Sequence, residues 1–167
     1  MKKITFAGNP VALIGEEIKV GDKVPAFELT NPDLTPLTDK DLKGKVVIYS
    51  IVPSIDTGVC SIQTKTFNER ATELSEDVVV LTVSEDLPFA QGRFCSVEGI
   101  ERAKIASDYK KNEFGKSFGF LMDGLFLLAR GIVVADKEGT VKYVEYVPEV
   151  THEVDFDKAI EAAKALI

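Results

Sequence analysis

The sequence predicts an α/β fold, in which a central mixed β-sheet carries helices on both faces. Two short, uncharged, β-branched runs, at residues 46–52 and 78–83, have the composition of buried strands. The segment between them, from residue 58 to about residue 75, has the apolar spacing of a helix that packs one face inward. Strand, helix and strand in this order form a βαβ unit, whose strands run parallel and whose crossover is right-handed.

The elements before this unit are short. Residues 2–7 and 11–20 are predicted to pair as an N-terminal β-hairpin, joined by the turn-favouring residues Gly8-Asn9-Pro10. Residues 27–30 form a short strand. The segment 31–43 is expected to be irregular, with one helical turn at residues 38–42, because it contains two prolines and three aspartates.

Three further elements follow the βαβ unit. Pro88 suits the first position of a helix, and a short helix from Phe89 carries Cys95 near its end. Residues 104–107 favour a brief strand, and residues 112–118 favour a helix.

The C-terminal part of the chain adds a second hairpin, which makes the sheet mixed. Its strands are predicted at residues 132–135 and 140–147, with Gly139 taking a positive φ in the turn. A closing amphipathic helix spans residues 156–167. Simple alternation in the second strand puts four residues on one face: Val141, Tyr143, Glu145 and Val147.

Length and composition indicate one globular domain over residues 1–167. A chain of 167 residues buries a core without disulfides or metals, and 45% hydrophobic with 28% charged residues is ordinary for a soluble protein. A net charge of −7 argues against nucleic acid or an anionic membrane as a partner. With a single histidine, the usual ligands of zinc or haem are lacking, so we expect no metal and no cofactor.

The N-terminus bears on location. No run approaches the ~20 apolar residues that span a bilayer. Met1-Lys2-Lys3 resembles the start of a signal peptide, but Gly8-Asn9-Pro10 interrupts the apolar stretch that follows. We therefore expect a cytoplasmic protein, in which two cysteines are more often catalytic or transiently paired than structural.

A candidate nucleophile lies between the first buried strand and the following helix. Pro53 ends the strand, and Thr57 and Cys60 have the spacing of a helix N-cap and its N3 residue. The dipole and free N–H groups of a helix start favour a thiolate. Counting 100° per residue, the thiol shares the inward face of the helix with three others: Phe67, Ala71 and Leu74.

The residues alone leave alternatives open. Free cysteines are usually inert, buried small hydrophobes, and either Cys60 or Cys95 fits that description. Arg130 precedes a predicted strand amid apolar neighbours, so it is either a surface arginine or a buried charge that needs a partner. His152 follows the last strand and is interpreted as a surface residue, not a catalytic base.

Two strings of sequence carry a resemblance to a known family. Residues 53–60 read PSIDTGVC, with the pattern Pro-x-x-x-Thr-x-x-Cys, and residues 86–95 read DLPFAQGRFC. With the opening Phe6-Ala7-Gly8-Asn9-Pro10 and with Leu128-Ala129-Arg130, they resemble the bacterial thiol peroxidase branch of the peroxiredoxins, the atypical two-cysteine peroxiredoxins. The resemblance covers nearly the whole chain and implies a thioredoxin-like fold with an N-terminal β-hairpin.

The resemblance implies a role for each of five residues. Cys60 is the peroxidatic residue, which reduces hydrogen peroxide or an alkyl hydroperoxide and becomes a sulfenic acid. Cys95 is the resolving residue, which forms a Cys60–Cys95 disulfide. Thr57 hydrogen-bonds the sulfur or the substrate, and Arg130 lies beside the sulfur. Pro53 shields the site from bulk water.

The resemblance also implies partners and a role in the cell. The disulfide is reduced by thioredoxin, the chain is a homodimer, and the activity serves antioxidant defence. Two other functions remain as alternatives. The first alternative, a disulfide exchanger, is disfavoured because the chain has no Cys-x-x-Cys motif: position 57 is threonine and position 63 is glutamine. A redox sensor registers oxidants without turning over with a reductase.

The apolar run at residues 120–128 has two interpretations. It is buried core, as such runs usually are, or an exposed wall for a dimer or an organic hydroperoxide.

Overall fold

A computed structural model describes residues 2–167 of the chain. The central sheet has seven strands, in the order β10-β9-β5-β6-β7-β3-β4. Along the chain they are β3 (Glu28–Thr30), β4 (Pro36–Thr38), β5 (Val46–Ile51), β6 (Val78–Ser84), β7 (Lys104–Ser107), β9 (Gly131–Ala135) and β10 (Val141–Tyr146). A small sheet of order β1-β2-β8 joins β1 (Lys3–Phe6), β2 (Asn9–Ile14) and β8 (Leu121–Met122).

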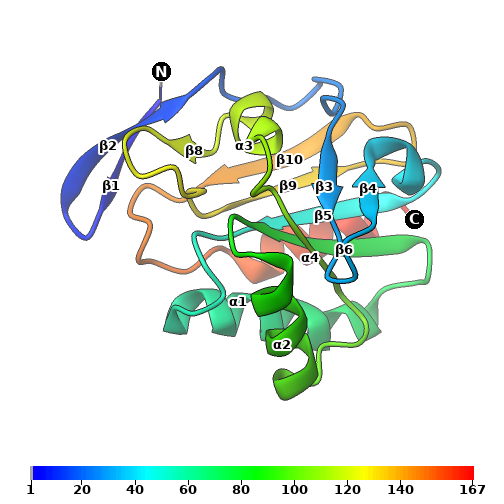
Figure 1. Ribbon diagram of the computed structural model, residues 1–167. Helices are drawn as coiled ribbons and strands as arrows, with labels where there is room; N and C mark the ends of the chain where they lie inside the picture. The colour runs from blue at the N-terminus through cyan, green and yellow to red at the C-terminus, as the bar shows by residue number, and fades with distance from the viewer. Residues whose placement is uncertain (1) are drawn as a thin grey trace.

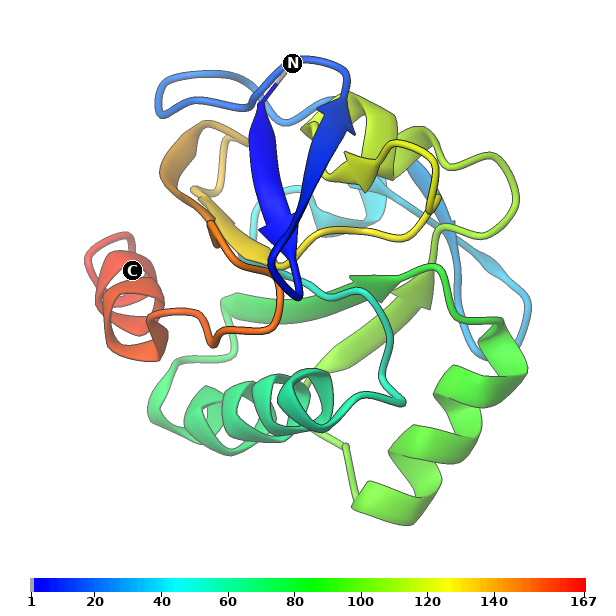
Figure 2. The same cartoon turned by 90° about the vertical axis from the view of Figure 1, so that its left-hand side faces the viewer.

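The helices lie on both faces of the central sheet, as predicted. Figures 1 and 2 show α1, α2 and α4 along one face, and α3 with the N-terminal hairpin over the other. Their bounds are α1 (Gly58–Arg70), α2 (Pro88–Glu98), α3 (Glu113–Phe118) and α4 (Phe156–Lys164), with 3-10 turns η1 (Asp39–Leu42) and η2 (Ala71–Glu73).

The predicted βαβ unit and mixed sheet are confirmed. β5 pairs parallel with β6, and β6 pairs parallel with β7. On its other side β5 pairs antiparallel with β9, which forms the predicted second hairpin with β10. All six residues of β5 are buried, as its uncharged, β-branched composition predicted, since both faces of this central strand are covered.

Two apolar clusters form the core, one on each face of the sheet. The cluster beneath α1 and α4 includes Phe67, Ile132 and Ile160. The cluster on the opposite face includes Phe27, Tyr49 and the aromatic pair Phe114 and Phe118, whose rings stack at a centroid distance of 3.9 Å. The four-residue spacing of that pair on α3 brings the two rings together.

Three details of the predicted elements are wrong. The second strand of the N-terminal hairpin ends at Ile14, because Gly15 takes a φ of +87° and breaks the extended backbone. The region predicted as irregular contains β4, which pairs with β3 at the edge of the sheet. Alternation in β10 fails because the register shifts between Val141 and Tyr143, which sends these two side chains to opposite core clusters.

The apolar run at 120–128 divides between the two interpretations. Its ends are buried, with Phe120 and Leu128 fully covered in the core. In the loop between them, Leu125 and Phe126 are 49% and 52% exposed. The core interpretation is therefore confirmed for the ends of the run, and the middle is an apolar part of the surface.

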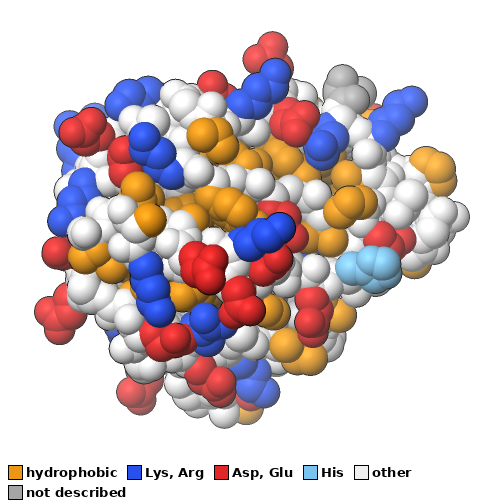
Figure 3. Space-filling model, turned by 180° about the vertical axis from the view of Figure 1, so that it is seen from behind, with side chains coloured by type: hydrophobic (Ala, Val, Ile, Leu, Met, Phe, Trp, Pro, Cys, Tyr) orange, Lys and Arg blue, Asp and Glu red, His pale blue; other side chains and the backbone are white. Residues whose placement is uncertain are grey.

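Charged side chains of both signs share the surface. On the face in Figure 3, acidic and basic groups are interspersed around apolar side chains, and the single histidine lies at the surface, as predicted for His152. Within residues 2–167, no helix is both long enough and apolar enough to cross a membrane.

Gly131 opens β9 at a point where two other segments come very close. A Cβ atom there would lie 2.2 Å from the backbone oxygen of Glu145 and 2.4 Å from Cε1 of Phe120. Both neighbours are fixed, one as the β10 backbone and the other as a buried core ring. Only glycine fits at this position.

We expect Gly131→Ala to lower the free energy of unfolding of the reduced protein by about 1–3 kcal/mol or more, because the added methyl overpacks the site. Urea denaturation measures the change. Gly92→Ala is the matched control, because its Cβ would meet Pro32 at an ordinary 3.4 Å and alanine favours the helix interior by up to about 1 kcal/mol. An unchanged stability for Gly131→Ala would contradict the steric argument.

Candidate active site

Cys60 lies in the first turn of α1 with the predicted cap. Thr57 is the N-cap in an extended conformation, and its Oγ1 accepts a hydrogen bond from the backbone N–H of Cys60 at 3.2 Å. The same hydroxyl donates to the Ser54 carbonyl at 3.3 Å. The Cys60 side chain is fully covered, and the other residues predicted to share its face of the helix are buried: Phe67, Ala71 and Leu74. The predicted helix is too long, however, because α1 ends at Arg70, and Ala71 and Leu74 lie beyond it.

Arg130 lies against the Cys60 sulfur. Its side chain is only 2% exposed, and its Nη2 donates to the Sγ of Cys60 at 3.1 Å. Nη1 donates to Oε1 of Gln63 at 3.0 Å, and Nε donates to the Val150 carbonyl at 2.7 Å. The surface-arginine alternative for Arg130 is therefore wrong: three partners hold the guanidinium inside the protein.

The charge of Arg130 has no carboxylate to balance it. Among residues 2–167, no Asp or Glu oxygen lies within 4.0 Å of its guanidinium nitrogens. A buried cation is costly unless an opposite charge compensates it. The sulfur of Cys60, as a thiolate, is the group in contact with Arg130 that is able to supply that charge.

Sheet topology brings these distant residues together. β5 and β9 are antiparallel, and Ile51 at the end of β5 pairs with Gly131 at the start of β9. Arg130, just before β9, therefore lies at the end of the sheet where β5 leads through Pro53 to Cys60. Pro53 is buried at this edge. Ligands in such sheets bind at the carboxyl ends of the parallel strands.

Gln63 is a site residue that the sequence analysis missed. It is 1% exposed, and its amide nitrogen donates to Ser50 Oγ at 2.8 Å, which directs its oxygen toward Arg130. Gln63 lies three residues after Cys60, so both side chains are on one side of α1. This spacing was the one signal in the sequence that Gln63 lies near the thiol. The pattern alone gives no reason for burying a glutamine there.

The N-terminal hairpin supports the segment that holds Arg130. Val150 donates its N–H to the carbonyl of Thr5 in β1 at 2.9 Å, while its own carbonyl receives Nε of Arg130. Glu149 accepts hydrogen bonds from Thr151, Gly8 and Thr5, and these bonds hold the pKa of its carboxyl well below the usual range. The hairpin thus fixes the position of one of the three Arg130 partners.

Cys95 lies apart from this arrangement. It is in α2, partly exposed, and packs against the core cluster beneath α1 and α4. Burial raises the pKa of the Cys95 thiol. Both cysteines are free thiols in this structure, so the predicted Cys60–Cys95 disulfide stays a prediction.

Comparison with known proteins decides the family. Residues 19–161 match the Redoxin family model. A thiol peroxidase from Halalkalibacterium halodurans is 54% identical over all 167 residues and its full length, and one from Bacillus subtilis is 50% identical over the whole chain and 99% of its own. The chain belongs to the thiol peroxidase family of redoxins.

Solved structures of the redoxin family agree with the fold. A peroxiredoxin-like protein from Aquifex aeolicus superimposes with a TM-score of 0.93 at 40% identity, covering all of this chain and 98% of its own. A thiol peroxidase from Chromobacterium violaceum has a TM-score of 0.87 at 17% identity over 99% and 97% of the two chains, which supports the fold alone. The expected fold, a mixed sheet flanked by helices with an N-terminal hairpin, is confirmed.

A hollow of about 140 Å³ lies between the loop before α1 and helix α2. Asp56 forms one side, and Arg93, Phe94, Val97 and Glu98 of α2 form the other. The hollow therefore lies between the loop that leads to Cys60 and the helix that carries Cys95.

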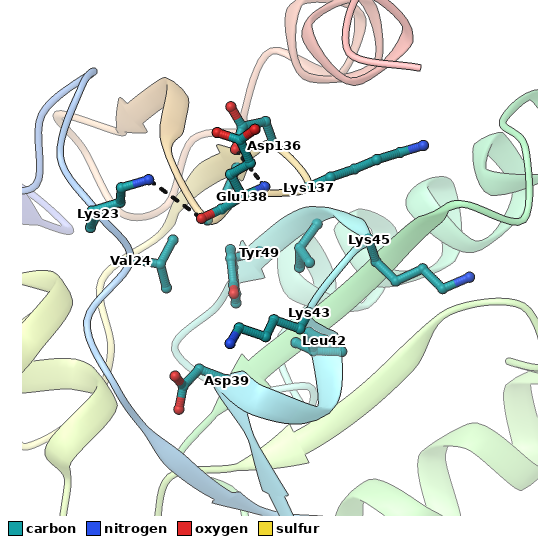
Figure 4. Close-up of a pocket in the computed structure, with 13 residues that line it drawn as sticks. Lys23, Val24, Asp39, Leu42, Lys43, Lys45, Tyr49, Asp136, Lys137 and Glu138 are labelled. Atoms are coloured by element: carbon teal, nitrogen blue, oxygen red, sulfur yellow. Dashed lines mark hydrogen bonds between the residues drawn. The ribbon is translucent and has the colours of Figure 1, made fainter.

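Another small hollow, of about 130 Å³, lies at the opposite end of the sheet (Figure 4). It is bordered by Lys23, Asp39, Lys43 and Tyr49, with residues of the β9–β10 turn. This is the end where β5 starts and β9 finishes, whereas Cys60 follows the end of β5. The hollow is therefore not part of the site around Cys60.

Two carboxyl groups, the half-buried Glu85 and the buried Asp108, directly follow the neighbouring strands β6 and β7. Burial and the Asp108 carboxylate raise the pKa of Glu85. Burial also raises the pKa of Asp108, although the N–H groups of Gly115 and Phe114 donate to its two oxygens at 2.8 and 3.1 Å. The pair holds a proton more tightly in the folded protein than in the unfolded chain.

We expect Gln63→Glu to slow the oxidation of Cys60 by about tenfold or more at neutral pH, because a carboxylate competes with the thiolate for Arg130. Loss of free thiol against a limiting hydroperoxide measures the rate. Gln63→Met, of similar size and uncharged, is the control and should slow the reaction less. Equal losses in both variants would contradict the electrostatic explanation.

We expect Glu85→Gln to flatten the dependence of stability on pH. A carboxyl with a raised pKa in the folded state stabilises fully below its ordinary value of 4.5 and loses that contribution as the pH rises through the raised value. The variant should therefore unfold at a higher temperature than wild type at alkaline pH, by about 2–4 °C per kcal/mol gained. Calorimetry across pH checks this, with the exposed Glu138→Gln as control; parallel profiles for Glu85→Gln and wild type would disprove it.

Proposed function

We propose that the chain is a thiol-dependent peroxidase that reduces hydrogen peroxide and alkyl hydroperoxides through Cys60. Membership of the thiol peroxidase family supports this reaction class. The observation that carries the assignment to Cys60 is the hydrogen bond of 3.1 Å from the buried Arg130 guanidinium to its sulfur. This cation compensates a thiolate, which is the form of cysteine that attacks peroxide.

In the first step the Cys60 thiolate attacks the terminal oxygen of ROOH. A sulfur–oxygen bond forms, the oxygen–oxygen bond breaks, and the alkoxide leaves and takes a proton to become the alcohol. Arg130 donates to the reacting centre, and the free N–H groups at the start of α1 stabilise negative charge there. Thr57 holds the turn at its N-cap position, and the buried Pro53 limits the access of water.

In the second step Cys95 attacks the sulfur of the Cys60 sulfenic acid. The disulfide forms as the sulfur–oxygen bond breaks and the oxygen leaves as water. Since Cys60 is fully covered and Cys95 packs on the core cluster beneath α1, this step requires local opening of one or both helices. α2 is suited to open: only Pro88 and Gln91 of its eleven residues are buried.

The disulfide is reduced by an external dithiol, which we propose to be thioredoxin. Its two thiols become a disulfide while Cys60 and Cys95 regain theirs, so electrons balance over the cycle. A reducing cytoplasm fits a chain whose two cysteines are too few for a disulfide scaffold. A homodimer and docking of the reductant both need exposed apolar surface, which is available at Leu87, Phe89, Val97, Leu125 and Phe126.

A redox sensor with the same fold is the second candidate. It would use the same thiolate, but it would not turn over repeatedly with a reductase and excess peroxide. Antioxidant defence requires that turnover.

The test is intact mass after one equivalent of tert-butyl hydroperoxide is added to the reduced protein. We expect the wild type to lose about two mass units and to join residues 60 and 95 in one disulfide-linked peptide pair. Cys95→Ser should stop with one added oxygen on Cys60, and Cys60→Ser should not react.

Each other outcome has a definite meaning. Added oxygen without a cross-link in the wild type would make Cys95 a bystander and leave a one-cysteine peroxidase. No reaction at all would make Cys60 structural and remove the proposed function. Sustained consumption of peroxide with thioredoxin and its reductase separates the enzyme from the sensor.

A further inference from the structure

Asp86 connects the segments that carry the two cysteines. It lies two residues after the end of β6, and its carboxylate accepts three hydrogen bonds. Ser54 Oγ donates to Oδ1 at 2.7 Å, while the Ile55 N–H and Ser84 Oγ donate to Oδ2 at 2.9 and 2.6 Å. Two of these donors, Ser54 and Ile55, belong to the loop between Pro53 and Cys60.

From Ser54 a continuous series of hydrogen bonds leads to Cys60. The Ser54 carbonyl accepts from both the N–H and the hydroxyl of Thr57, each at 3.3 Å. The Thr57 hydroxyl oxygen then accepts from the Cys60 N–H at 3.2 Å. Asp86 therefore fixes the loop whose threonine caps α1 and sets the position of the sulfur beside Arg130.

A second branch leads from Asp86 to α2. The Ser84 hydroxyl, which donates to Asp86, accepts from the amide nitrogen of Gln91 at 3.0 Å. Gln91 is fully buried and also donates to the Ala106 carbonyl at 3.0 Å. Cys95 lies one turn further along the same helix.

The attachment of α2 is the weaker branch. Its N-cap, Leu87, provides no side-chain hydrogen bond to the helix start, and Gly92 lies in its interior. Among the protein atoms of residues 2–167, the Gln91 side chain is held only through its amide nitrogen, and its Oε1 atom accepts no hydrogen bond from them. In contrast, the three donors lie 2.6 to 2.9 Å from the Asp86 carboxylate oxygens, which are the lengths of well-formed hydrogen bonds.

We propose that Asp86 is a positioning residue for the peroxidase reaction and the junction that links the two steps. It acts through Ser54, Ile55 and Thr57 to hold Cys60 for attack on peroxide, and through Ser84 and Gln91 to hold α2 away until resolution. This inference rests on the proposed function of Cys60 and Cys95. In this proposal the branch through Ser54 and Thr57 promotes the oxidation of Cys60, and the branch through Ser84 and Gln91 delays the formation of the disulfide.

The test measures both steps separately in one reaction. Reduced protein is mixed with tert-butyl hydroperoxide, quenched at intervals, and analysed by mass for the Cys60 sulfenic acid and for the disulfide. Asp86→Asn keeps the shape of the side chain but removes its charge, so the hydrogen bonds from Ser54, Ile55 and Ser84 are no longer charge-assisted and hold the loop less firmly. We expect sulfenic acid formation to slow by about tenfold or more.

Gln91→Met removes the second branch and keeps a side chain of similar length. We expect the ratio of the resolution rate to the oxidation rate to rise several-fold, because α2 opens more readily. Leu37→Ala, in β4 at the far edge of the sheet, is the control for general destabilisation and should leave that ratio unchanged. If Asp86→Asn does not fold, Ser54→Ala removes one of the three hydrogen bonds to the carboxylate and should also slow the oxidation of Cys60.

The inference fails if oxidation is as fast in Asp86→Asn, or in Ser54→Ala where that replaces it, as in wild type. It also fails if Gln91→Met shifts both rates equally, as a merely structural change would. These results differ from failure of the proposed function, in which the wild type itself forms no sulfenic acid on Cys60.

Discussion

The contact between the Arg130 guanidinium and the Cys60 sulfur is the constraint on which the site depends. A cation that is 2% exposed and has no carboxylate partner within residues 2–167 is stable only if its surroundings supply negative charge and acceptors. The Gln63 and Val150 oxygens satisfy two of its nitrogens, and the sulfur satisfies the third. The energetic cost of burying the arginine is thus offset when the cysteine is ionised, which links the stability of the fold to the reactive state of the thiol.

That contact in turn requires the topology of the sheet. Arg130 and Cys60 are 70 residues apart and meet because β5 and β9 are antiparallel neighbours with Ile51 opposite Gly131. Glycine is needed at the first position of β9, since Phe120 and the β10 backbone occupy the space of a side chain. The N-terminal hairpin completes the arrangement, because Thr5 holds Val150, whose carbonyl receives Arg130.

The two helices that carry the cysteines differ in how firmly they are held in the fold. α1 has a side-chain cap at Thr57 and buries Cys60, Gln63, Thr64 and Phe67 beneath it. α2 has no side-chain cap, buries two residues, and exposes Leu87, Phe89 and Val97 by more than half. A rigid nucleophile favours the first reaction, which needs a fixed geometry, whereas a loosely held partner favours the second, which needs movement. The Asp86 carboxylate is hydrogen-bonded to the loop before α1 and, through Ser84, to Gln91 of α2.

The sequence by itself determined the features that obey local rules. Buried strands, the βαβ order, the Thr57 cap and the Pro88 helix start all follow from composition and spacing within a few residues, and the thiol peroxidase resemblance supplied Arg130 and Cys95 as candidates. Only the tertiary structure decided which groups meet. The contacts of Arg130 with Cys60 and Gln63, and those of Asp86 with Ser54 and Ile55, join residues 30 to 70 positions apart. The bulge in β10 depends on its register against β9. Local propensity does not encode such contacts, because they arise from strand register and from the packing that register imposes.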